Sequence, residues 1–208
     1  SVQEQTLYKK WMEFNADVYS MTQKATHFSK IEKSIWTPKD INNKEQTIKE
    51  IEALEPYVEA TEQGNTKHNE EWTLVRRLIH TMEFTANPGR NLKFYLKDKV
   101  TGKILGIVCM GSDVTSLGAR DNYIGWTKEN KFKDGKLKYT SIGTTICCAQ
   151  PLGFNFLGGK LVACFVTSSV VRDAWKETYG RTLVGTSTTS LYGIHSMYNS
   201  IPLWKTLG

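Results

Sequence analysis

The sequence has no run of about eighteen apolar residues, the length that a helix needs to cross a bilayer. Its first ten residues, SVQEQTLYKK, are mostly polar and include no apolar signal segment. These two features argue against a membrane partner and against secretion. We therefore expect an intracellular protein.

Cysteine is scarce, and metal-binding patterns are missing. The four cysteines form no CxxC pair, and apolar residues flank each of them. They are Cys109, Cys147, Cys148 and Cys164. We predict buried thiols on strands rather than a disulfide framework or a zinc knuckle. The four histidines are scattered without an HxH or HExxH pattern, so we predict no metal site.

Positive charge is concentrated in the second part of the chain. Up to Leu92 there are 12 Lys+Arg against 14 Asp+Glu, a balance of −2, whereas from Lys93 onward there are 15 against 7, a balance of +8. Such asymmetry favours a polyanionic partner. The alternative is the basic, solvated surface of an ordinary enzyme.

The first ninety residues are predicted to be helical. Ile48, Ile51, Leu54 and Val58 recur at helical spacing, which predicts a helix over 43–63. A second helix is expected over 69–84, before the Asn-Pro-Gly break at 87–89, and a helical stripe is possible within 1–37. We expect region 1–90 to act as a cap or adaptor, with the helices at 43–84 as a possible face for a protein partner.

From residue 91 the pattern changes to strands. We predict a hairpin of strands 92–97 and 104–110, a strand at 140–148, a helix over 161–179 that Gly180 ends, and a β-prone segment at 182–189. The expected fold is α/β, with a helical region 1–90 followed by an α/β domain 91–208.

A glycine-containing loop between strand 140–148 and the next helix could bind a phosphate. Glycines there let the backbone approach an anion, and the exposed amides of the helix would hold it. The loop matches neither GxGxxG nor GxxxxGK[ST]. In the alternative interpretation, Gly158 and Gly159 only allow close helix–sheet packing.

The order hairpin, strand, glycine loop, helix, strand resembles the core of the acyl-CoA N-acyltransferases, the GNAT superfamily. Gln150 to Asn155 resembles the start of that family's pyrophosphate loop, and Leu203 to Gly208 resembles its L-Y-E-K-x-G segment. This resemblance implies a mixed sheet with flanking helices and an acyl-CoA or similar phosphate-bearing donor. Trp204 stands where the family often has an acidic tyrosine, so Tyr192 or Tyr198 would have to replace it.

A second resemblance covers about 102–208. Leu105-Gly106, the R-D-x-x-I-G-W element at 120–126, the segment 174–180 and the segment 198–208 occur in this order. This resembles the Druantia antiphage component A family and its phage relatives. It implies phage or antiphage biology in the cytoplasm of a bacterial host cell, with DNA as partner. Acyltransferase-like proteins of the Mom type, which modify DNA bases, are compatible with it.

Together these features define the candidate site residues. Asp121, Asp113 or Tyr192 would act in proton transfer, while Gly153, Asn155, Gly158, Gly159 and Lys160 would hold the donor. DNA would be contacted by Arg120, Tyr123, Trp126, Lys128, Lys131, Lys133, Lys136 and Lys138. Alternatives remain for several of these residues: Arg120 and Asp121 as an ion pair that fixes a loop, Trp126 as a core residue, and the lysines as a solvated hairpin.

The first functional hypothesis is a phage-type transferase that modifies a DNA base by acyltransferase-like chemistry. The second is a non-catalytic DNA-binding or DNA-sensing module on a degenerate acyltransferase fold. The third is a phage inhibitor that binds a host protein.

Overall fold

The computed structural model describes residues 2–7, 9, 31–80, 82, 88–149, 152, 156, 158–190 and 196–207. Five strands form one sheet in the order β1-β2-β3-β4-β5. The strands are β1 (Pro56–Ala60), β2 (Asn91–Asp98), β3 (Ile104–Ser112), β4 (Thr140–Cys148) and β5 (Gly185–Ser187). The pairs β1–β2, β2–β3 and β3–β4 are antiparallel, whereas β5 runs parallel to β4.

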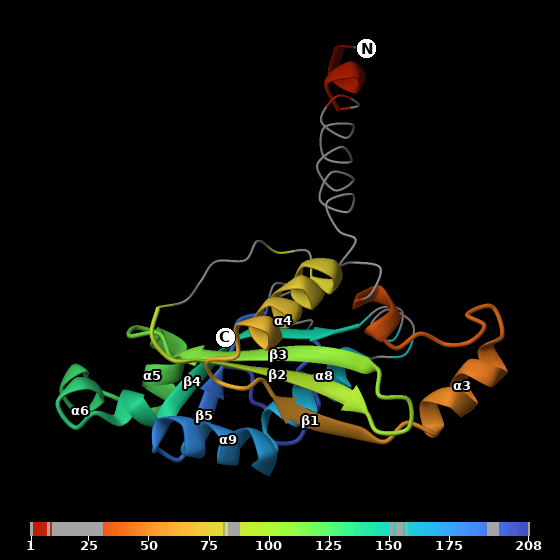
Figure 1. Cartoon of the computed structure of the whole chain (residues 1–208). Coiled ribbons are helices and arrows are strands. Elements are labelled where there is room, and N and C mark those ends of the chain that lie inside the picture. Colours follow the sequence, from red (N-terminus) through yellow and green to blue (C-terminus); the bar gives the residue numbers. More distant parts are fainter. Residues whose placement is uncertain are drawn as a thin grey trace.

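Helices cover both faces of the sheet (Figure 1). One face carries α4 (Thr66–Ile79), whose Trp72 and Val75 pack with Tyr95 and Ile107. The other face carries α8 (Gly158–Val166) and α9 (Ser169–Tyr179). This two-sided burial explains why β3 reads as an unbroken apolar run. No helix in the described part of the chain is long and apolar enough to cross a membrane.

The hairpin β2–β3 and the strand β4 confirm the predicted strands, and the mixed α/β class is confirmed. Strand β3 contains a β-bulge, because Leu96 pairs with Gly106 but Lys97 pairs with Ile104. Leu105 is the extra residue and belongs to the core under α8. Gly106 faces the same helix, since a Cβ there would lie 2.5 Å from Cγ2 of Val162.

Two helix predictions are wrong in part. The helix predicted over 43–63 is α3 (Lys44–Glu52), and the chain then enters β1 at Pro56. Proline has no N–H to donate and disfavours a helical residue before it, so the helical spacing of Leu54 and Val58 was misleading. Strand β1 pairs with β2, so the sheet includes residues on both sides of position 90.

The helix predicted over 161–179 is two helices. Its first part begins earlier, at Gly158, and ends at Val166. The Ser168 side chain then accepts a hydrogen bond from the Val171 amide and caps the start of α9. Gly180 ends α9 in the left-handed conformation, as predicted. The helix predicted over 69–84 is α4, which starts at Thr66 behind the Asn65 cap and ends at Ile79.

The cysteines are only partly as predicted. Cys109 and Cys148 are buried on strands, and Cys147 is half-buried. Cys164 instead lies on α8 and is exposed. Burial raises the pKa of the Cys147 thiol to about 11 and that of Cys148 to about 12, so neither is a ready nucleophile.

Candidate functional site: a buried charge network beside a basic pocket

The R-D-x-x-I-G-W element forms the short helix α5 (Gly118–Ile124) and the turn that ends it. Gly125 adopts φ 75°, a left-handed conformation that favours glycine at the end of a helix. The turn lets the Trp126 amide bond back to the Asp121 carbonyl at 2.8 Å. The glycine in this element therefore has a conformational role, and it leads the chain directly into α6 (Lys128–Phe132).

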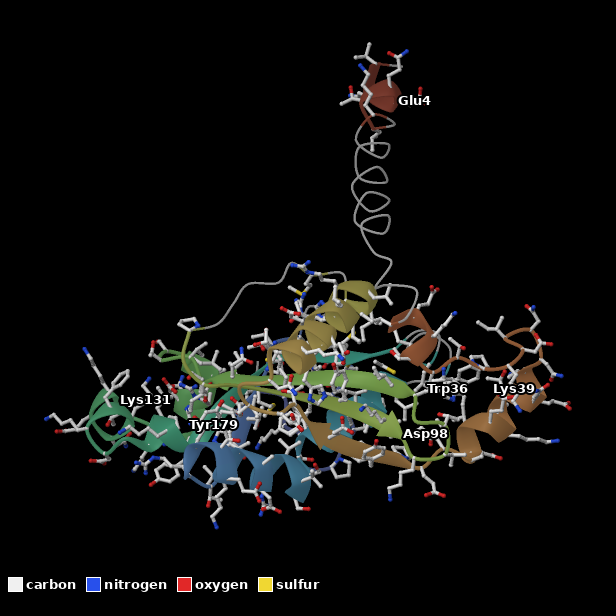
Figure 2. The ribbon with its side chains drawn as sticks, viewed as in Figure 1. Glu4, Trp36, Lys39, Asp98, Lys131 and Tyr179 are labelled. Carbon is white, nitrogen blue, oxygen red and sulfur yellow. The ribbon has the colours of Figure 1, made fainter. Side chains whose placement is uncertain are left out.

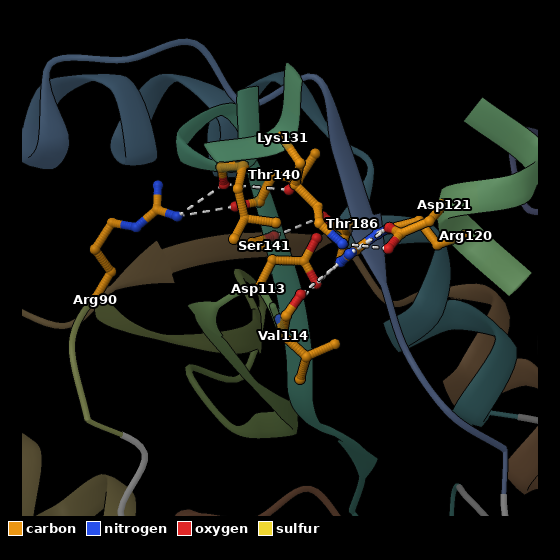
Figure 3. A network of polar contacts seen from close by, with 10 residues as sticks. Arg90, Asp113, Val114, Arg120, Asp121, Lys131, Thr140, Ser141 and Thr186 are labelled. Carbon is orange, nitrogen blue, oxygen red and sulfur yellow. Dashed lines mark hydrogen bonds and ion pairs between the residues drawn. The ribbon is translucent and has the colours of Figure 1, made fainter. Parts of the chain in front are cut away.

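Arg120 is the centre of a buried charge network (Figure 3). Its Nη1 lies 2.7 Å from Oδ1 of Asp113, at the end of β3, and its Nη2 lies 2.6 Å from Oδ1 of Asp121. Nη1 also donates to the Val114 carbonyl at 3.0 Å. The Arg120 side chain is only 4% exposed and that of Asp113 is fully buried. A guanidinium with these partners ties β3 to α5, which is the arrangement of the ion-pair alternative.

Lys131 completes the network from α6. Its ammonium group pairs with Oδ2 of Asp121, and its side chain is 7% exposed. Both carboxylate oxygens of Asp121 are therefore occupied, one by Arg120 and one by Lys131. Among the lysines predicted to contact DNA, Lys131 differs from the others because it is buried and paired. It positions α6 against α5.

The pKa values of the two carboxyl groups in the network are shifted in opposite directions. Burial alone would raise the pKa of Asp121, but hydrogen bonds from Lys131 and Arg120 outweigh burial and hold that pKa below its usual value. Burial raises the pKa of Asp113 and exceeds the opposing effects of Thr140 and Arg120. Of the two, Asp113 therefore takes up a proton at the higher pH.

The other predicted lysines form an exposed basic surface. It consists of Lys128 and Lys133 around α6, and Lys136 and Lys138 in the 3-10 helix η1 (Lys136–Tyr139). Lys133 pairs with Glu129 at 2.7 Å, and both side chains are largely in solvent. We call these four residues the lysine surface. The segment 127–139 is thus a short helix and a 3-10 turn rather than a hairpin.

The two predicted stacking residues differ in exposure. Tyr123 is 58% exposed, and the Lys205 ammonium lies 4.4 Å from its ring centroid. Trp126 is half-buried, with the Arg120 guanidinium 5.3 Å from its ring centroid. Tyr123 is therefore accessible to a partner, whereas Trp126 lies against the buried network.

The predicted donor loop is described only in part. Gly153, Asn155 and Tyr192 lie outside the described residues. A Cβ on Gly158 would lie 2.4 Å from Sγ of Cys148 and 2.7 Å from Cγ of Leu152, so this glycine allows close packing of α8 on the sheet. Lys160 donates to the Asn199 carbonyl at 2.7 Å. These contacts agree with the packing alternative for Gly158.

A pocket of about 390 Å³ opens beside the network, and its lining includes residues that the sequence did not indicate. Arg90 reaches across from the start of β2 and donates to the carbonyls of Lys138 at 2.6 Å and Thr140 at 3.1 Å. Tyr179, the last residue of α9, and Arg181 also line it, and the Arg90 guanidinium lies 5.9 Å from the Tyr179 ring centroid. Arg90 follows the turn at Gly89, and Arg181 follows the turn at Gly180. These turns can be predicted from the sequence, but only the fold shows that the two arginines line the same pocket. Among the described residues, no group of histidine, cysteine and carboxylate side chains could hold a metal ion.

The fold and site define an α/β protein with a three-layer architecture and a basic end. Comparison with known families places it more closely: the family described as Druantia protein DruA matches residues 13–208. The chain therefore belongs to this family, which confirms that part of the resemblance.

A curated relative supports the same assignment. The Druantia protein DruA of Escherichia coli (strain UMEA 4076-1) is 32% identical over 138 residues, covering 61% of this chain and 33% of the relative. The chain thus matches about a third of that protein's length. No solved structure matches significantly.

Proposed function

We propose that this chain is the DNA-contacting part of an antiphage defence protein. Membership of the Druantia family supports the role in defence. The observation that supports DNA contact is the lysine surface beside the Arg90–Arg181 pocket. Cations gathered at one end of a fold release counterions when they meet phosphates, which is the main source of sequence-independent affinity for DNA.

The buried network supports this proposal because it separates structural charges from available charges. Arg120 and Lys131 are neutralised by Asp113 and Asp121. In the described part of the chain, Lys133 is the one member of the lysine surface with an ion-pair partner, and that pair is solvent-exposed. Exposed pairs of this kind are weak, so all four ammonium groups remain available to phosphates.

The test replaces Lys128, Lys133, Lys136 and Lys138 together by glutamine. We expect DNA affinity at low salt to fall more than tenfold, and the slope of log K against log salt to become shallower by about 3 to 4. Fluorescence anisotropy with labelled duplex and single-stranded DNA measures both quantities.

A charge-matched control is available at the other end of the sheet. The four residues of this control are exposed: Lys39, Lys44, Lys49 and Lys99. Lys44 and Lys49 belong to α3, and Lys99 follows Asp98 directly. Figures 1 and 2 show α3, Lys39 and Asp98 at the end of the molecule away from α6 and Lys131. Their replacement by glutamine changes the net charge equally and is expected to have a much smaller effect. Equal losses in the two variants, or no DNA binding by the unmodified chain, would refute the proposal.

The sheet topology favours a second candidate, acyl transfer to a DNA base. Strands β4 and β5 are parallel, are joined through α8 and α9, and pair over Thr140–Ile142 in the described part of the chain. This arrangement is similar to the acyltransferase core that the sequence resembles. Asp113 would be the proton acceptor rather than Asp121, because burial raises the pKa of Asp113 whereas hydrogen bonds from Lys131 and Arg120 lower that of Asp121. Mass spectrometry of nucleosides from DNA co-expressed with the chain, compared with Asp113→Asn, tests it: an unmodified profile in both would contradict acyl transfer.

A further inference from the structure

The pocket beside the network carries positive charge that no carboxylate balances. Three cationic side chains line it: Arg90, Lys138 and Arg181. Within the described residues, none of the three has an ion-pair partner. The one carboxylate in the lining, Asp113, is fully buried and already paired with Arg120. The pocket therefore attracts an anion.

Two of these cations are held close enough to disfavour each other. Arg90 is fixed in place, because its Nη1 donates to the Lys138 carbonyl at 2.6 Å and its Nη2 to the Thr140 carbonyl at 3.1 Å (Figure 3). Burial lowers the pKa of Arg90 most, and the charge of Arg181 acts in the same direction. An anion in the pocket would offset this repulsion between the two guanidinium groups.

The pocket also has hydrogen-bond donors that the fold leaves available. The hydroxyls of Ser112 and Tyr179 each accept a hydrogen bond from a backbone amide at or just before the start of β2, at 2.9 and 2.8 Å. Each hydroxyl proton lacks an acceptor among the described residues, and burial raises the pKa of Tyr179, so its proton is retained. Arg181 is exposed and uses one nitrogen, Nη1, to bind the Tyr139 hydroxyl at 3.2 Å. Available donors that outnumber acceptors are suited to an oxyanion.

We propose that this pocket binds one phosphate group, held by Arg181 and Lys138 and by the hydroxyls of Ser112 and Tyr179. The oxygens of a phosphate can accept from several donors at once, and a guanidinium binds two of them side by side. The volume of about 390 Å³ is within the range of about 300–1,000 Å³ that is usual for small-molecule sites.

The phosphate has two possible sources, a DNA strand that runs over the lysine surface and a free phosphate ester. Lys138 belongs both to the lining of the pocket and to the lysine surface, which favours the strand. That choice of source rests on the proposed contact with DNA, whereas the binding of a phosphate group by the pocket does not.

The first test uses inorganic phosphate as the probe and thermal melting as the readout. Each chain is melted in sodium phosphate and in sodium chloride of equal ionic strength. Phosphate also stabilises proteins by exclusion from their surface, so the comparison is made between two arginine variants. Arg181→Gln removes a pocket residue, and Arg172→Gln removes an exposed arginine near the start of α9, outside the lining. We expect phosphate to raise the melting temperature of the unmodified chain and of Arg172→Gln by about 2–4 °C more than that of Arg181→Gln.

A third variant separates hydrogen bonding from charge. Tyr179→Phe keeps the net charge and removes one donor, so it should lose part of the phosphate-dependent rise and leave the salt dependence of DNA binding unchanged. Arg181→Gln should instead make the slope of log K against log salt shallower by about 1. Each variant is compared with itself in the two salts, so a change in its basal stability does not alter the conclusion.

The second test identifies the source of the phosphate. DNA affinity is measured by fluorescence anisotropy in phosphate and in chloride at equal ionic strength. If a strand phosphate occupies the pocket, free phosphate should weaken DNA binding by the unmodified chain several-fold and have little effect on Arg181→Gln. Equal DNA affinity in the two salts, together with the phosphate-dependent rise in melting temperature, would assign the pocket to a free phosphate ester.

The outcomes distinguish this inference from the proposed function. An equal phosphate-dependent rise in the unmodified chain and in Arg181→Gln would overturn the phosphate pocket, even if the lysine surface binds DNA. A rise that Arg181→Gln loses, in a chain that does not bind DNA, would support the pocket and refute the DNA contact.

Discussion

The buried network and the lysine surface are neighbours in the chain, yet they use the same side-chain chemistry for opposite purposes. Lys131 and Lys133 lie two residues apart on or beside α6. The first is 7% exposed and paired with Asp121, whereas the second is 76% exposed and paired with Glu129. Positive charge in this stretch therefore indicates two roles, attachment of α6 to the fold and attraction of a polyanion, and only burial separates them.

The largest expected effect is the loss of Arg120. Arg120→Ala leaves the buried Asp113 and the Asp121 carboxylate without their shared cation, so we expect the free energy of unfolding to fall by about 3–5 kcal/mol. Lys136→Ala on the lysine surface should change it by no more than about 0.5 kcal/mol. Urea denaturation of the two variants measures the contrast. A cost below about 1 kcal/mol for Arg120→Ala would show that the network does not stabilise the fold.

A smaller difference is expected between the two neighbouring lysines. Lys131→Gln removes a buried partner of Asp121 and should cost about 1–3 kcal/mol of unfolding free energy. Lys133→Gln breaks an exposed pair and should cost about 0–1 kcal/mol. The order should reverse for DNA affinity, measured per folded molecule, where Lys133→Gln has the greater effect. Suppose that both variants are fully folded and that Lys131→Gln weakens DNA binding more than Lys133→Gln does. The assignment of Lys131 to the fold and of Lys133 to DNA contact would then be wrong.

The smallest expected effect is a pH dependence of opposite sign for the two carboxyl groups. The pKa of folded Asp121 lies below the unfolded value of about 3.9, so its contribution to stability is present above that pH and is lost as the pH falls. The pKa of folded Asp113 lies above it, so stability declines as the pH rises from about 4 toward the raised pKa.

Denaturation midpoints between pH 3 and 7 measure both slopes. Asp121→Asn should weaken the loss of stability in acid, and Asp113→Asn should weaken the decline above pH 4. If both variants altered the pH dependence of stability in the same way, the assignment of opposite pKa shifts to Asp113 and Asp121 would be wrong.

The sequence predicted the strands better than the site. Strand β4 was found at its full length because β-branched and thiol side chains recur between turn residues. The network was predicted only as far as the adjacent Arg120 and Asp121. Its link to Asp113 depends on how α5 folds back against the end of β3. The pocket could not be predicted at all, because Arg90 and Tyr179 meet only when α9 packs across the sheet.

The bulge at Leu105 limits how the length of this protein can change. Because it inserts one residue between Lys97 and Leu96 of the paired strand, Leu105 and Gly106 both face α8. Deletion of Leu105 would restore a regular pleat and leave Ile104 on the α4 side, at the cost of one side chain in the core under α8. A one-residue deletion elsewhere in β3 would instead exchange the α4 and α8 faces of the residues that precede it. The bulge is thus the position in β3 where the length of the strand can change by one residue without turning its faces over.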